Sequence, residues 1–335
     1  MGDVRRAFVL AAGFGTRLRP LAEELPKPAW PFFDVPLAAH VLRLLHRSGV
    51  GEGVVNLHHL PDLLQDALTP WVPEGLRVHW SREAEILGTG GALAGWRAFL
   101  AQGSFLLANG DTYQEIDLDA MERFHRERGG LATLALRRLP AGDAGPIETD
   151  AEGRIVRFLS SRLPGAGTGT PCEFTGIHCL EPEILEHLPP GPHCINAQVH
   201  AKLVARGERL FGFPVPDRAF WSDLGTPERY LGSHRDLLAS GRVPPGRPGT
   251  VILGRERTAE GGDVVGPSYL GRGARVEEGA VAGPFAVVGS GAVVACGTRL
   301  EESVLWPGAT TKRGDVLGRT ILSASGRSLR VGPGG

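Results

Sequence analysis

The chain has 335 residues, which is enough for two domains. Hydrophobic residues make up 42% and charged residues 22%, a balance typical of folded soluble proteins that argues against a disordered chain. The formal net charge is −1. Proteins that hold nucleic acid by its phosphates usually carry a basic excess, so we expect no nucleic-acid partner.

The first 240 residues alternate between strand-like apolar runs and helix-like segments. We expect strands at 8–11, 54–56, 76–80, 105–108 and 131–136, and helices at 40–48, 61–68, 90–100 and 119–128. This alternation predicts an α/β fold with a mostly parallel sheet wrapped by helices. Ligands of such sheets bind beyond the carboxyl ends of the strands. A glycine-rich loop follows the first expected strand there, and Asn109-Gly110-Asp111 follows the fourth.

A second pattern occupies the C-terminal part of the chain. An apolar residue recurs every six positions, and a residue that is usually small follows four positions later. The apolar positions are Val264, Leu270, Val276, Ala282, Val288, Val294, Leu300 and Trp306, and the second set is Ser268, Ala274, Ala280, Ala286, Ala292, Thr298, Val304 and Thr310. Eight repeats in register predict a parallel β-helix in which the apolar residues stack inward.

These patterns divide the chain into a domain at 1–240, a Pro- and Gly-rich linker at 241–250 and a β-helix at 251–325. No segment has the apolar length that a bilayer span needs, so no membrane partner is expected. The four cysteines, Cys172, Cys179, Cys194 and Cys296, form no CxxC pair and are interpreted as free thiols of a reducing compartment. We therefore expect a cytoplasmic protein.

The glycine-rich loop reads LAAGFGTRL over residues 10–18 and is followed by PKP at 26–28. Glycines after a strand let backbone N–H groups face a phosphate chain. A dinucleotide-binding loop needs a third glycine where Leu18 stands, and a Walker-type loop needs a Gly-Lys-Ser/Thr sequence that is absent. The remaining interpretation is a loop that supplies Arg17 and Lys27 to phosphates. Lys27 is one of only three lysines in the chain, which gives its position between two prolines some weight.

These motifs resemble the signature of sugar-1-phosphate nucleotidyltransferases. The resemblance covers nearly the whole chain and includes GTGGAL at 88–93, NGD at 109–111 and WSDLGTPE at 221–228. With the expected β-helix, the layout is similar to the mannose-1-phosphate guanylyltransferase branch. The resemblance implies a Rossmann-like mixed-sheet catalytic domain followed by a left-handed β-helix of hexapeptide repeats. The implied reaction transfers a nucleoside monophosphate from a nucleoside triphosphate (NTP) to a sugar 1-phosphate and releases pyrophosphate.

The resemblance further implies that Arg17 and Lys27 are catalytic and that Asp111 and Asp223 bind Mg²⁺. Two polyanions must meet for attack on the α-phosphorus, and their repulsion requires fixed positive charge. Arg17 can hold the triphosphate through its planar guanidinium, and Lys27 can offer a compact charge near the α-phosphate. Mg²⁺ prefers carboxylate, phosphate and water oxygens as ligands. Taken alone, Asp111 also fits a turn and Asp223 a helix cap.

The same resemblance assigns the substrate contacts. The nucleotide-binding positions are Leu10, Ala11, Ala12, Gly13, Gly15, Thr16, Glu85 and Gly90, and the sugar-binding positions are Asn109, Gly110, Glu173, Thr175 and Gly176. Glu85 can accept hydrogen bonds from guanine, which favours GTP. Many relatives hold the sugar phosphate with a lysine just before the Glu173 region. In that stretch this chain has only arginines, Arg157 and Arg162, as candidate replacements.

Several functions remain open at this point. GTP with mannose 1-phosphate is the first choice, while uridylyl or thymidylyl transfer to N-acetylmuramate 1-phosphate or glucose 1-phosphate, and transfer to heptose 1-phosphate, are alternatives. An acyltransferase site within the β-helix would need a histidine base, and the last histidine is His234, before the repeats. A non-catalytic regulatory homologue would tend to lose Arg17, Lys27 or the aspartates, all of which are present. The β-helix is expected to mediate homo-oligomer formation.

Overall fold

The computed structural model describes residues 4–140, 142–245 and 249–332. Its contacts divide the chain into two compact units. The first unit contains the chain up to residue 13 and residues 38–223, and the second contains residues 14–37 and the chain from 224 onward. Residues 14–37, which include the second half of the glycine-rich loop, therefore group with the C-terminal part of the chain.

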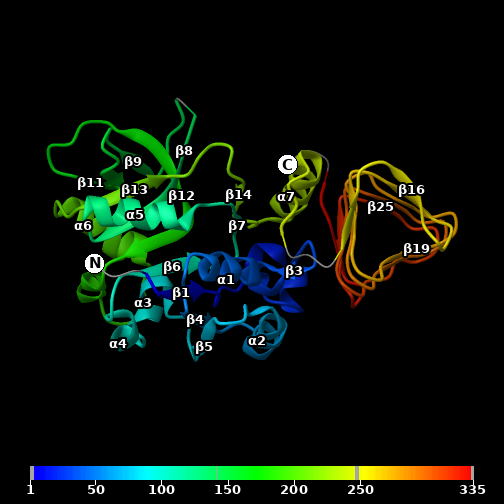
Figure 1. Cartoon of the computed structure of the whole chain (residues 1–335), viewed down its shortest axis with the longest axis horizontal. Coiled ribbons are helices and arrows are strands. Elements are labelled where there is room, and N and C mark those ends of the chain that lie inside the picture. The colour runs from blue at the N-terminus through cyan, green and yellow to red at the C-terminus, as the bar shows by residue number, and fades with distance from the viewer. Residues whose placement is uncertain (1–3, 141, 246–248, 333–335) are drawn as a thin grey trace. The chain divides into compact units, whose positions relative to one another are not determined.

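The first unit is built on a ten-stranded mixed sheet (Figure 1). Four parallel strands form one half in the order β5 (Arg77–Arg82), β4 (Glu52–Leu57), β1 (Arg6–Leu10) and β6 (Phe105–Asn109). The middle of β1, β4 and β6 is a run of fully buried apolar side chains, as is typical of parallel strands covered on both faces. The carboxyl ends of β1 and β6 meet where Leu10 pairs with Asn109.

The other half of the sheet is organised by the long strand β12 (Thr170–Leu180). It runs antiparallel to β6, to β8 (Ala132–Arg138) and to β9 (Ile147–Thr149). β13 (Leu210–Pro214) pairs parallel with β8, and β10 (Ile155–Phe158) and β11 (Ser161–Arg162) continue the edge beyond β9. The register between β8 and β12 shifts between Phe174 and His178. This irregular stretch contains Thr175 and Gly176, two of the expected sugar-binding positions.

Helices connect the strands of the first unit. They are α1 (Leu37–Arg47), α2 (Pro61–Leu68), α3 (Gly88–Ala94), α4 (Arg97–Leu100), α5 (Leu118–Arg128) and α6 (Ala201–Ala205), with 3₁₀ turns η4 (Thr69–Trp71) and η5 (Pro182–His187) and a π turn η6 (Asn196–His200). The single helix expected at 90–100 is instead two short helices, because the chain leaves helical pairing at Gly95 and Trp96. α5 begins where the Asp117 side chain accepts a hydrogen bond from the Ala120 N–H, and ends at Gly129 in a left-handed conformation.

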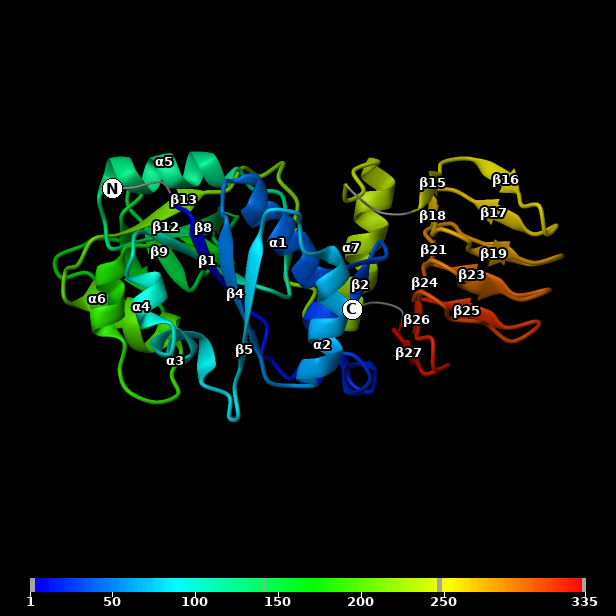
Figure 2. The same cartoon turned by 60° about the horizontal axis from the view of Figure 1, so that its bottom comes forward.

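The second unit contains a coil of short strands, defined here as residues 250–330 and called the C-terminal coil. Its strands are β15 (Thr250–Ile252), β16 (Arg255–Arg257), β17 (Asp263–Val265), β18 (Ser268–Leu270), β19 (Arg275–Val276), β20 (Val281–Ala282), β21 (Val287–Val288), β22 (Val293–Val294), β23 (Arg299–Glu301), β24 (Val304–Leu305), β25 (Val316–Gly318), β26 (Thr320–Leu322) and β27 (Ser328–Arg330). Most of these strands pair in parallel and form three sheets, and paired residues such as Asp263 and Val281 lie one turn of the coil apart. Figure 1 shows the coil end on with three sides, and Figure 2 shows its strands stacked. This arrangement is consistent with a β-helix.

The six-residue pattern holds through Leu300 and then slips by one residue. Val288 pairs with Leu305 and not with Trp306, so Leu305 takes the inward position that the sequence assigned to Trp306. Correspondingly, Ala309 is buried while Thr310 is exposed. The cause is a turn at Glu301 to Ser303 that is one residue shorter than its predecessors. Trp306 consequently leaves the apolar stack and contacts Trp30, with 5.0 Å between ring centroids.

The rest of the second unit consists of residues 14–37 and α7 (Pro227–Ser240). The N-terminal segment forms the short turns η1 (Thr16–Leu18), η2 (Leu21–Glu23) and η3 (Lys27–Ala29) and the hairpin β2 (Pro31–Phe32) and β3 (Val35–Pro36). α7 ends at Gly241, where the expected linker 241–250 begins. Residues 246–248 of that linker lie outside the described residues, and β15 already includes Thr250.

Candidate active site

A hydrogen-bonded network fixes the end of β1. The Ala11 N–H donates to Asn56 Oδ1 at 2.6 Å, and Asn56 Nδ2 donates to Glu83 Oε1 at 2.7 Å. Glu83 Oε2 in turn accepts from the Leu87 N–H at 3.1 Å. Asn56 is buried at the end of β4, so its amide joins the start of the glycine-rich loop to the segment before α3. The network therefore links Ala11 and Leu87, which belong to the two segments expected to hold the nucleotide.

Asn56 and Glu83 are not among the site residues that the sequence motifs indicated. The available signal was a single polar residue at the end of an otherwise apolar strand, Val54-Val55-Asn56. Such a residue needs a partner because an unpaired buried amide is costly. The partner, Glu83, is 27 residues away, and the pairing of β4 with β5 brings the two strand ends together.

The glycines at the start of α3 are needed for close packing. The Gly90 N–H donates to the His193 carbonyl at 3.0 Å. A Cβ atom on Gly90 would lie 2.3 Å from His193 Nε2, and one on Gly91 would lie 2.8 Å from the Gly191 carbonyl oxygen. Gly88 has a φ of +73° and approaches the His193 backbone in the same way. Gly90, expected to contact the nucleotide, thus has a packing role in this structure. Glu85 is exposed and makes no hydrogen bond with any described residue.

Four of the five expected sugar-binding residues lie together where β6 meets β12. The Gly110 N–H donates to the Leu10 carbonyl at 2.8 Å, and a Cβ on Gly110 would crowd that same oxygen at 3.0 Å. Gly176 has a φ of +107° and lies against the Asn109 side chain. The Thr175 hydroxyl is fully buried and donates to the Ala135 carbonyl at 3.1 Å, so only the backbone of Thr175 remains for other contacts.

Glu173, the fifth of these residues, forms an ion pair that the sequence did not indicate. Arg137 on β8 is its register partner, and Arg137 Nε donates to Glu173 Oε1 at 2.9 Å. The Arg137 guanidinium also lies over the Trp221 ring, 5.2 Å from its centroid. Trp221 Nε1 donates to the Thr175 carbonyl at 2.6 Å. Arg137 is therefore placed among the expected sugar-binding residues.

Gln114 lies in the same neighbourhood. Its Nε2 donates to the Thr175 carbonyl at 3.4 Å. Its Oε1 is buried and makes no hydrogen bond within the described residues. A buried amide oxygen without a partner is uncommon in folded proteins, which makes Gln114 a candidate acceptor for a ligand hydroxyl group.

The two arginines considered as replacements for the sugar-phosphate lysine are engaged elsewhere. Arg157 Nε donates to Glu148 Oε1 at 2.5 Å, and Arg162 donates to Glu148 Oε2 at 3.0 Å. Arg157 also donates to the Gly145 carbonyl, and Arg162 to the Gly167 carbonyl. Burial alone would raise the pKa of Glu148, but hydrogen bonds from the Gly169 N–H and the two arginines lower it. Arg157 and Arg162 thus balance a buried carboxylate on β9.

The two expected metal ligands flank one pair of short strands. β7 (Tyr113–Gln114) runs antiparallel to β14 (Trp221–Ser222), with Trp221 opposite Gln114 and Ser222 opposite Tyr113. Asp223 directly follows β14, and Asp111 lies two residues before β7. Both aspartates are partly exposed. Carboxylates that can reach solvent suit Mg²⁺, which usually takes one or two of them together with phosphate and water oxygens.

The two expected catalytic cations lie in the second unit, because the chain passes into it after Gly13. Gly15, with a φ of +60°, precedes η1, and a Cβ there would meet Ala22 and Lys27 at 3.4 Å. Thr16 and Arg17 on η1 are exposed, and Arg17 makes no hydrogen bond or ion pair with the described residues. Lys27 opens η3, and only 6% of its surface is exposed.

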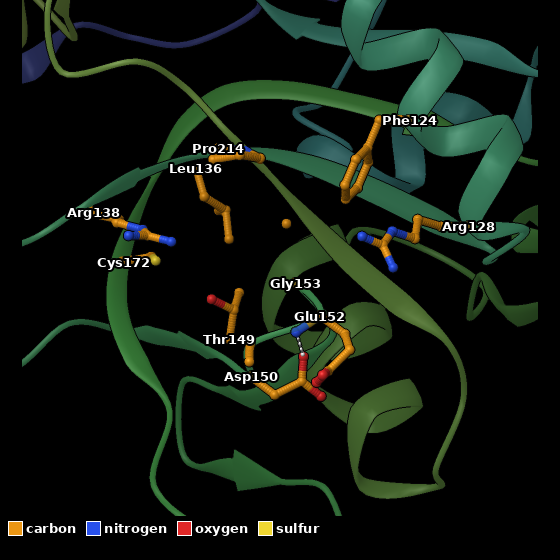
Figure 3. A pocket seen from close by; sticks show the side chains of 12 residues that line it. Phe124, Arg128, Leu136, Arg138, Thr149, Asp150, Glu152, Gly153, Cys172 and Pro214 are labelled. Atoms are coloured by element: carbon orange, nitrogen blue, oxygen red, sulfur yellow. Dashed lines mark hydrogen bonds between the residues drawn. The ribbon is translucent and has the colours of Figure 1, made fainter.

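A separate cavity of about 130 Å³ lies elsewhere in the first unit (Figure 3). Its lining includes Phe124, Leu136 and Thr149, with Arg128 and Arg138 on opposite sides. Cys172 also lines it, and because neighbouring strand residues point to opposite faces, Glu173 lies on the other face of β12. None of the expected site residues lines this cavity.

Within residues 4–140, 142–245 and 249–332, no three His, Cys, Asp or Glu side chains cluster in a way that could hold an ion. His58 follows β4 and pairs with the Glu83 carbonyl at 2.9 Å.

Among the helices of the described part, none has both the length and the apolarity needed to cross a membrane.

Comparison with known proteins decides the family. Residues 6–240 match the family model described as nucleotidyl transferase. The chain belongs to the nucleotidyl transferase family. It is an enzyme of the sugar-1-phosphate nucleotidyltransferase kind, as the sequence motifs indicated. Nucleotidyltransferases of this family generally use divalent metal ions, and the donor set of Asp111 and Asp223 fits such an ion.

Its relatives include guanylyl- and uridylyltransferases. The chain is 30% identical over 323 residues to the probable mannose-1-phosphate guanylyltransferase 3 of Oryza sativa subsp. japonica, covering 95% of this chain and 85% of the relative. It is 28% identical to a UTP–glucose-1-phosphate uridylyltransferase of Synechocystis, covering 97% and 90%. Among solved structures, HddC from Yersinia pseudotuberculosis complexed with GMP-PN aligns with a TM-score of 0.56 at 23% identity, covering 69% of this chain and 98% of that one. This last likeness shows the α/β fold.

Proposed function

We propose that the protein transfers GMP from GTP to mannose 1-phosphate, giving GDP-mannose and pyrophosphate. The observation that carries the proposal is the gathering of chemically suited groups at one edge of the sheet in the first unit. These groups are the end of β1 beside Asn109, the Glu173–Arg137 pair, whose arginine lies over Trp221, and the short strands β7 and β14 next to Asp111 and Asp223.

On the nucleotide side, the backbone of residues 10–13 and the segment at 85–90 receive the base and ribose. The Asn56–Glu83 network holds both segments, so they are ordered before the nucleotide binds and less conformational entropy is lost on binding. Glu85 is exposed and can accept hydrogen bonds from guanine N1–H and N2–H₂, which is the reason for preferring GTP.

On the sugar side, Arg137 supplies the positive charge that the family lysine supplies in relatives. Arg157 and Arg162 are committed to Glu148, whereas Arg137 lies beside Glu173 and Trp221. A guanidinium has five N–H donors, so Arg137 can bind a phosphate while it keeps its bond to Glu173. Glu173 and the Gln114 amide oxygen accept hydrogen bonds from sugar hydroxyl groups.

The reaction is an in-line displacement at the α-phosphorus. An oxygen of the sugar phosphate attacks, the bond to the β-phosphate bridging oxygen breaks, and pyrophosphate leaves with the bonding electron pair. Mg²⁺ held by Asp111 and Asp223 would neutralise charge on the phosphates. Arg17 holds the triphosphate and the leaving pyrophosphate, and Lys27 stabilises charge that develops on the α-phosphate oxygens.

The proposal extends to architecture and location. The C-terminal coil is proposed to be a left-handed β-helix of hexapeptide repeats that mediates homo-oligomer formation, with the domains divided as the sequence predicted. A cytoplasmic location is supported by the four free thiols.

The experiment that tests the function is pyrophosphate release by the purified protein with Mg²⁺, across GTP, ATP, UTP and dTTP and several sugar 1-phosphates. Turnover restricted to GTP and mannose 1-phosphate supports the full proposal. Turnover with UTP and glucose 1-phosphate, or with another pair, retains the reaction and replaces the substrates. A folded protein that is inactive with every pair contradicts the proposal.

A further inference from the structure

The segment that carries Arg17 and Lys27 is attached to the C-terminal coil by specific contacts. At its end, the hairpin β2–β3 turns through Phe33 and Asp34, whose φ angles of +50° and +68° are those of a two-residue hairpin loop. This turn places the Asp34 carboxylate against the coil, more than 230 residues further along the chain.

The coil receives the Asp34 carboxylate with four hydrogen bonds. The Ser290 N–H donates to both oxygens at 3.0 and 3.1 Å, the Ser290 hydroxyl donates at 2.7 Å, and the Tyr269 hydroxyl donates at 3.0 Å. Only 7% of the Asp34 surface is exposed. Burial raises the pKa of Asp34, and the bonds from Ser290 and Tyr269 oppose that shift. A buried carboxylate with this many donors holds its surroundings in one geometry.

The coil is shaped to leave room for this side chain. A Cβ atom on Gly271 would lie 2.3 Å from Asp34 Oδ2 and 2.3 Å from the Ser290 nitrogen. Any side chain at position 271 would therefore displace the carboxylate. The site depends on the absence of a Cβ on the coil as well as on the aspartate in the hairpin.

Two further contacts precede Asp34 along the segment. Trp30 packs edge-on against Trp306, which leaves the inward stack at the shortened turn, and against Tyr230 of α7 at 5.3 Å between ring centroids. Closer to Arg17, Glu24 accepts hydrogen bonds from the Ser325 hydroxyl at 2.6 Å and pairs with Arg327 at 3.0 Å.

We propose that Asp34 is a positioning residue, through which the C-terminal coil sets the conformation of the segment that bears Arg17 and Lys27. The coil is then a required part of the catalytic apparatus, in addition to any role in assembly. This inference rests on the proposed function, because it takes the phosphate-binding roles of Arg17 and Lys27 from it.

Two variants disrupt the contact from opposite sides. Asp34→Asn replaces one acceptor oxygen by an NH₂ group, which cannot accept the hydrogen bonds that Ser290 and Tyr269 donate. Gly271→Ala displaces the carboxylate without removing any polar group. Matched controls lie in the coil away from the segment. Asp263→Asn loses the charge of an aspartate paired with Arg255, and Gly262→Ala places a Cβ 2.4 Å from the Val276 carbonyl oxygen.

The first readout is hydrogen exchange in the full-length protein. Amides of residues 14–37 are expected to exchange about tenfold faster in both test variants and to be unchanged in both controls, since local opening follows the loss of tertiary contacts. The second is kcat/KM for the NTP, expected to fall at least about tenfold, the effect of one lost charge-assisted hydrogen bond. The third test is the double variant of Asp34→Asn with Arg17→Met. Its kcat/KM for the NTP is expected to be no lower than that of Arg17→Met alone, because both substitutions act through one interaction.

The inference would be overturned if hydrogen exchange of residues 14–37 were unchanged in the test variants. It would also be overturned if the losses in kcat/KM multiplied in the double variant, or if the control variants lost as much as the test variants. Full activity of Asp34→Asn in spite of faster exchange would also overturn it. A wild-type protein that is inactive with every substrate pair instead contradicts the proposed function. The two failures are distinguishable because hydrogen exchange reports on the Asp34 contact without any turnover.

Discussion

His200 Nε2 lies 3.2 Å from His178 Nδ1, and both rings are buried in the first unit. Burial lowers the pKa of His200 to about 3 and, together with the neighbouring His200, lowers the pKa of His178 well below 6.5. Phe174 and Phe158 are the aromatic neighbours of this pair. Both histidines are therefore neutral in the folded protein at neutral pH.

This pair predicts acid sensitivity. Below about pH 6.5 the unfolded chain binds protons at these histidines and the folded chain does not, so the free energy of unfolding falls as pH falls toward 3. At pH 5, one such histidine lowers the free energy of unfolding by about 2 kcal/mol. Urea unfolding of the wild type and His200→Gln at pH 7.5 and 5.0 should show a smaller pH effect in the variant. An equal pH effect in the two proteins would refute the assignment.

Asp111→Asn and Asp223→Asn should each reduce kcat by about a hundredfold or more, because each removes a carboxylate ligand that neutralises phosphate charge through the metal. Both variants should also bind Mn²⁺ more weakly in equilibrium dialysis with nucleotide present. Asp119→Asn, an exposed aspartate in the first turn of α5, serves as the control and should keep full activity. Unchanged turnover in the Asp111 variant would exclude the metal role.

Arg137→Met should raise KM for the sugar 1-phosphate about tenfold or more while leaving KM for the NTP unchanged, since a phosphate loses a charge-assisted partner. Arg137→Lys keeps the charge without the planar guanidinium and should be intermediate.

Arg157→Met is the comparison that separates binding from stability. It leaves Glu148 buried with one partner fewer and should lower the free energy of unfolding by about 1–3 kcal/mol, with little change in either KM. If the KM for the sugar 1-phosphate rose in Arg157→Met and not in Arg137→Met, the result would favour the sequence-based expectation that Arg157 holds the sugar phosphate.

Asn56→Ala should weaken NTP binding more than sugar-phosphate binding. It leaves the buried Ala11 N–H and one Glu83 oxygen without their partner, a cost of about 1–3 kcal/mol for such groups. Isothermal titration with a non-hydrolysable NTP measures the effect directly. Gln65→Ala, which removes an exposed hydrogen bond to Arg82, is the control. Equal nucleotide affinity in Asn56→Ala and the wild type would show that the network does not organise the nucleotide site.

Deletion of residues 250–335 tests the role of the coil in assembly. Light scattering should show a smaller assembly than the full chain forms, because the coil is proposed to mediate homo-oligomer formation. An oligomer with the same number of subunits after deletion would refute this, and would leave the positioning role of Asp34 to the point variants.

The sequence by itself determined the features that depend on local periodicity and on motifs. Apolar runs predicted the strands at 105–108 and 131–136, and the NGD and PKP motifs indicated the family that the comparison confirmed. Hexad spacing predicted stacked turns through Leu300. These patterns are readable because a buried strand or an inward-facing repeat imposes its period on neighbouring residues.

Only the tertiary structure decided which distant residues meet. The pairing of Arg137 with Glu173 depends on the register of β8 against β12, and the Asn56–Glu83 bond on β4 against β5. Trp306 leaves the apolar stack because the turn before it is one residue shorter. Asp34 binds Ser290 because packing brings together residues that are 256 positions apart. Such contacts leave no periodic trace, because a single polar partner is chosen by three-dimensional proximity and not by spacing along the chain.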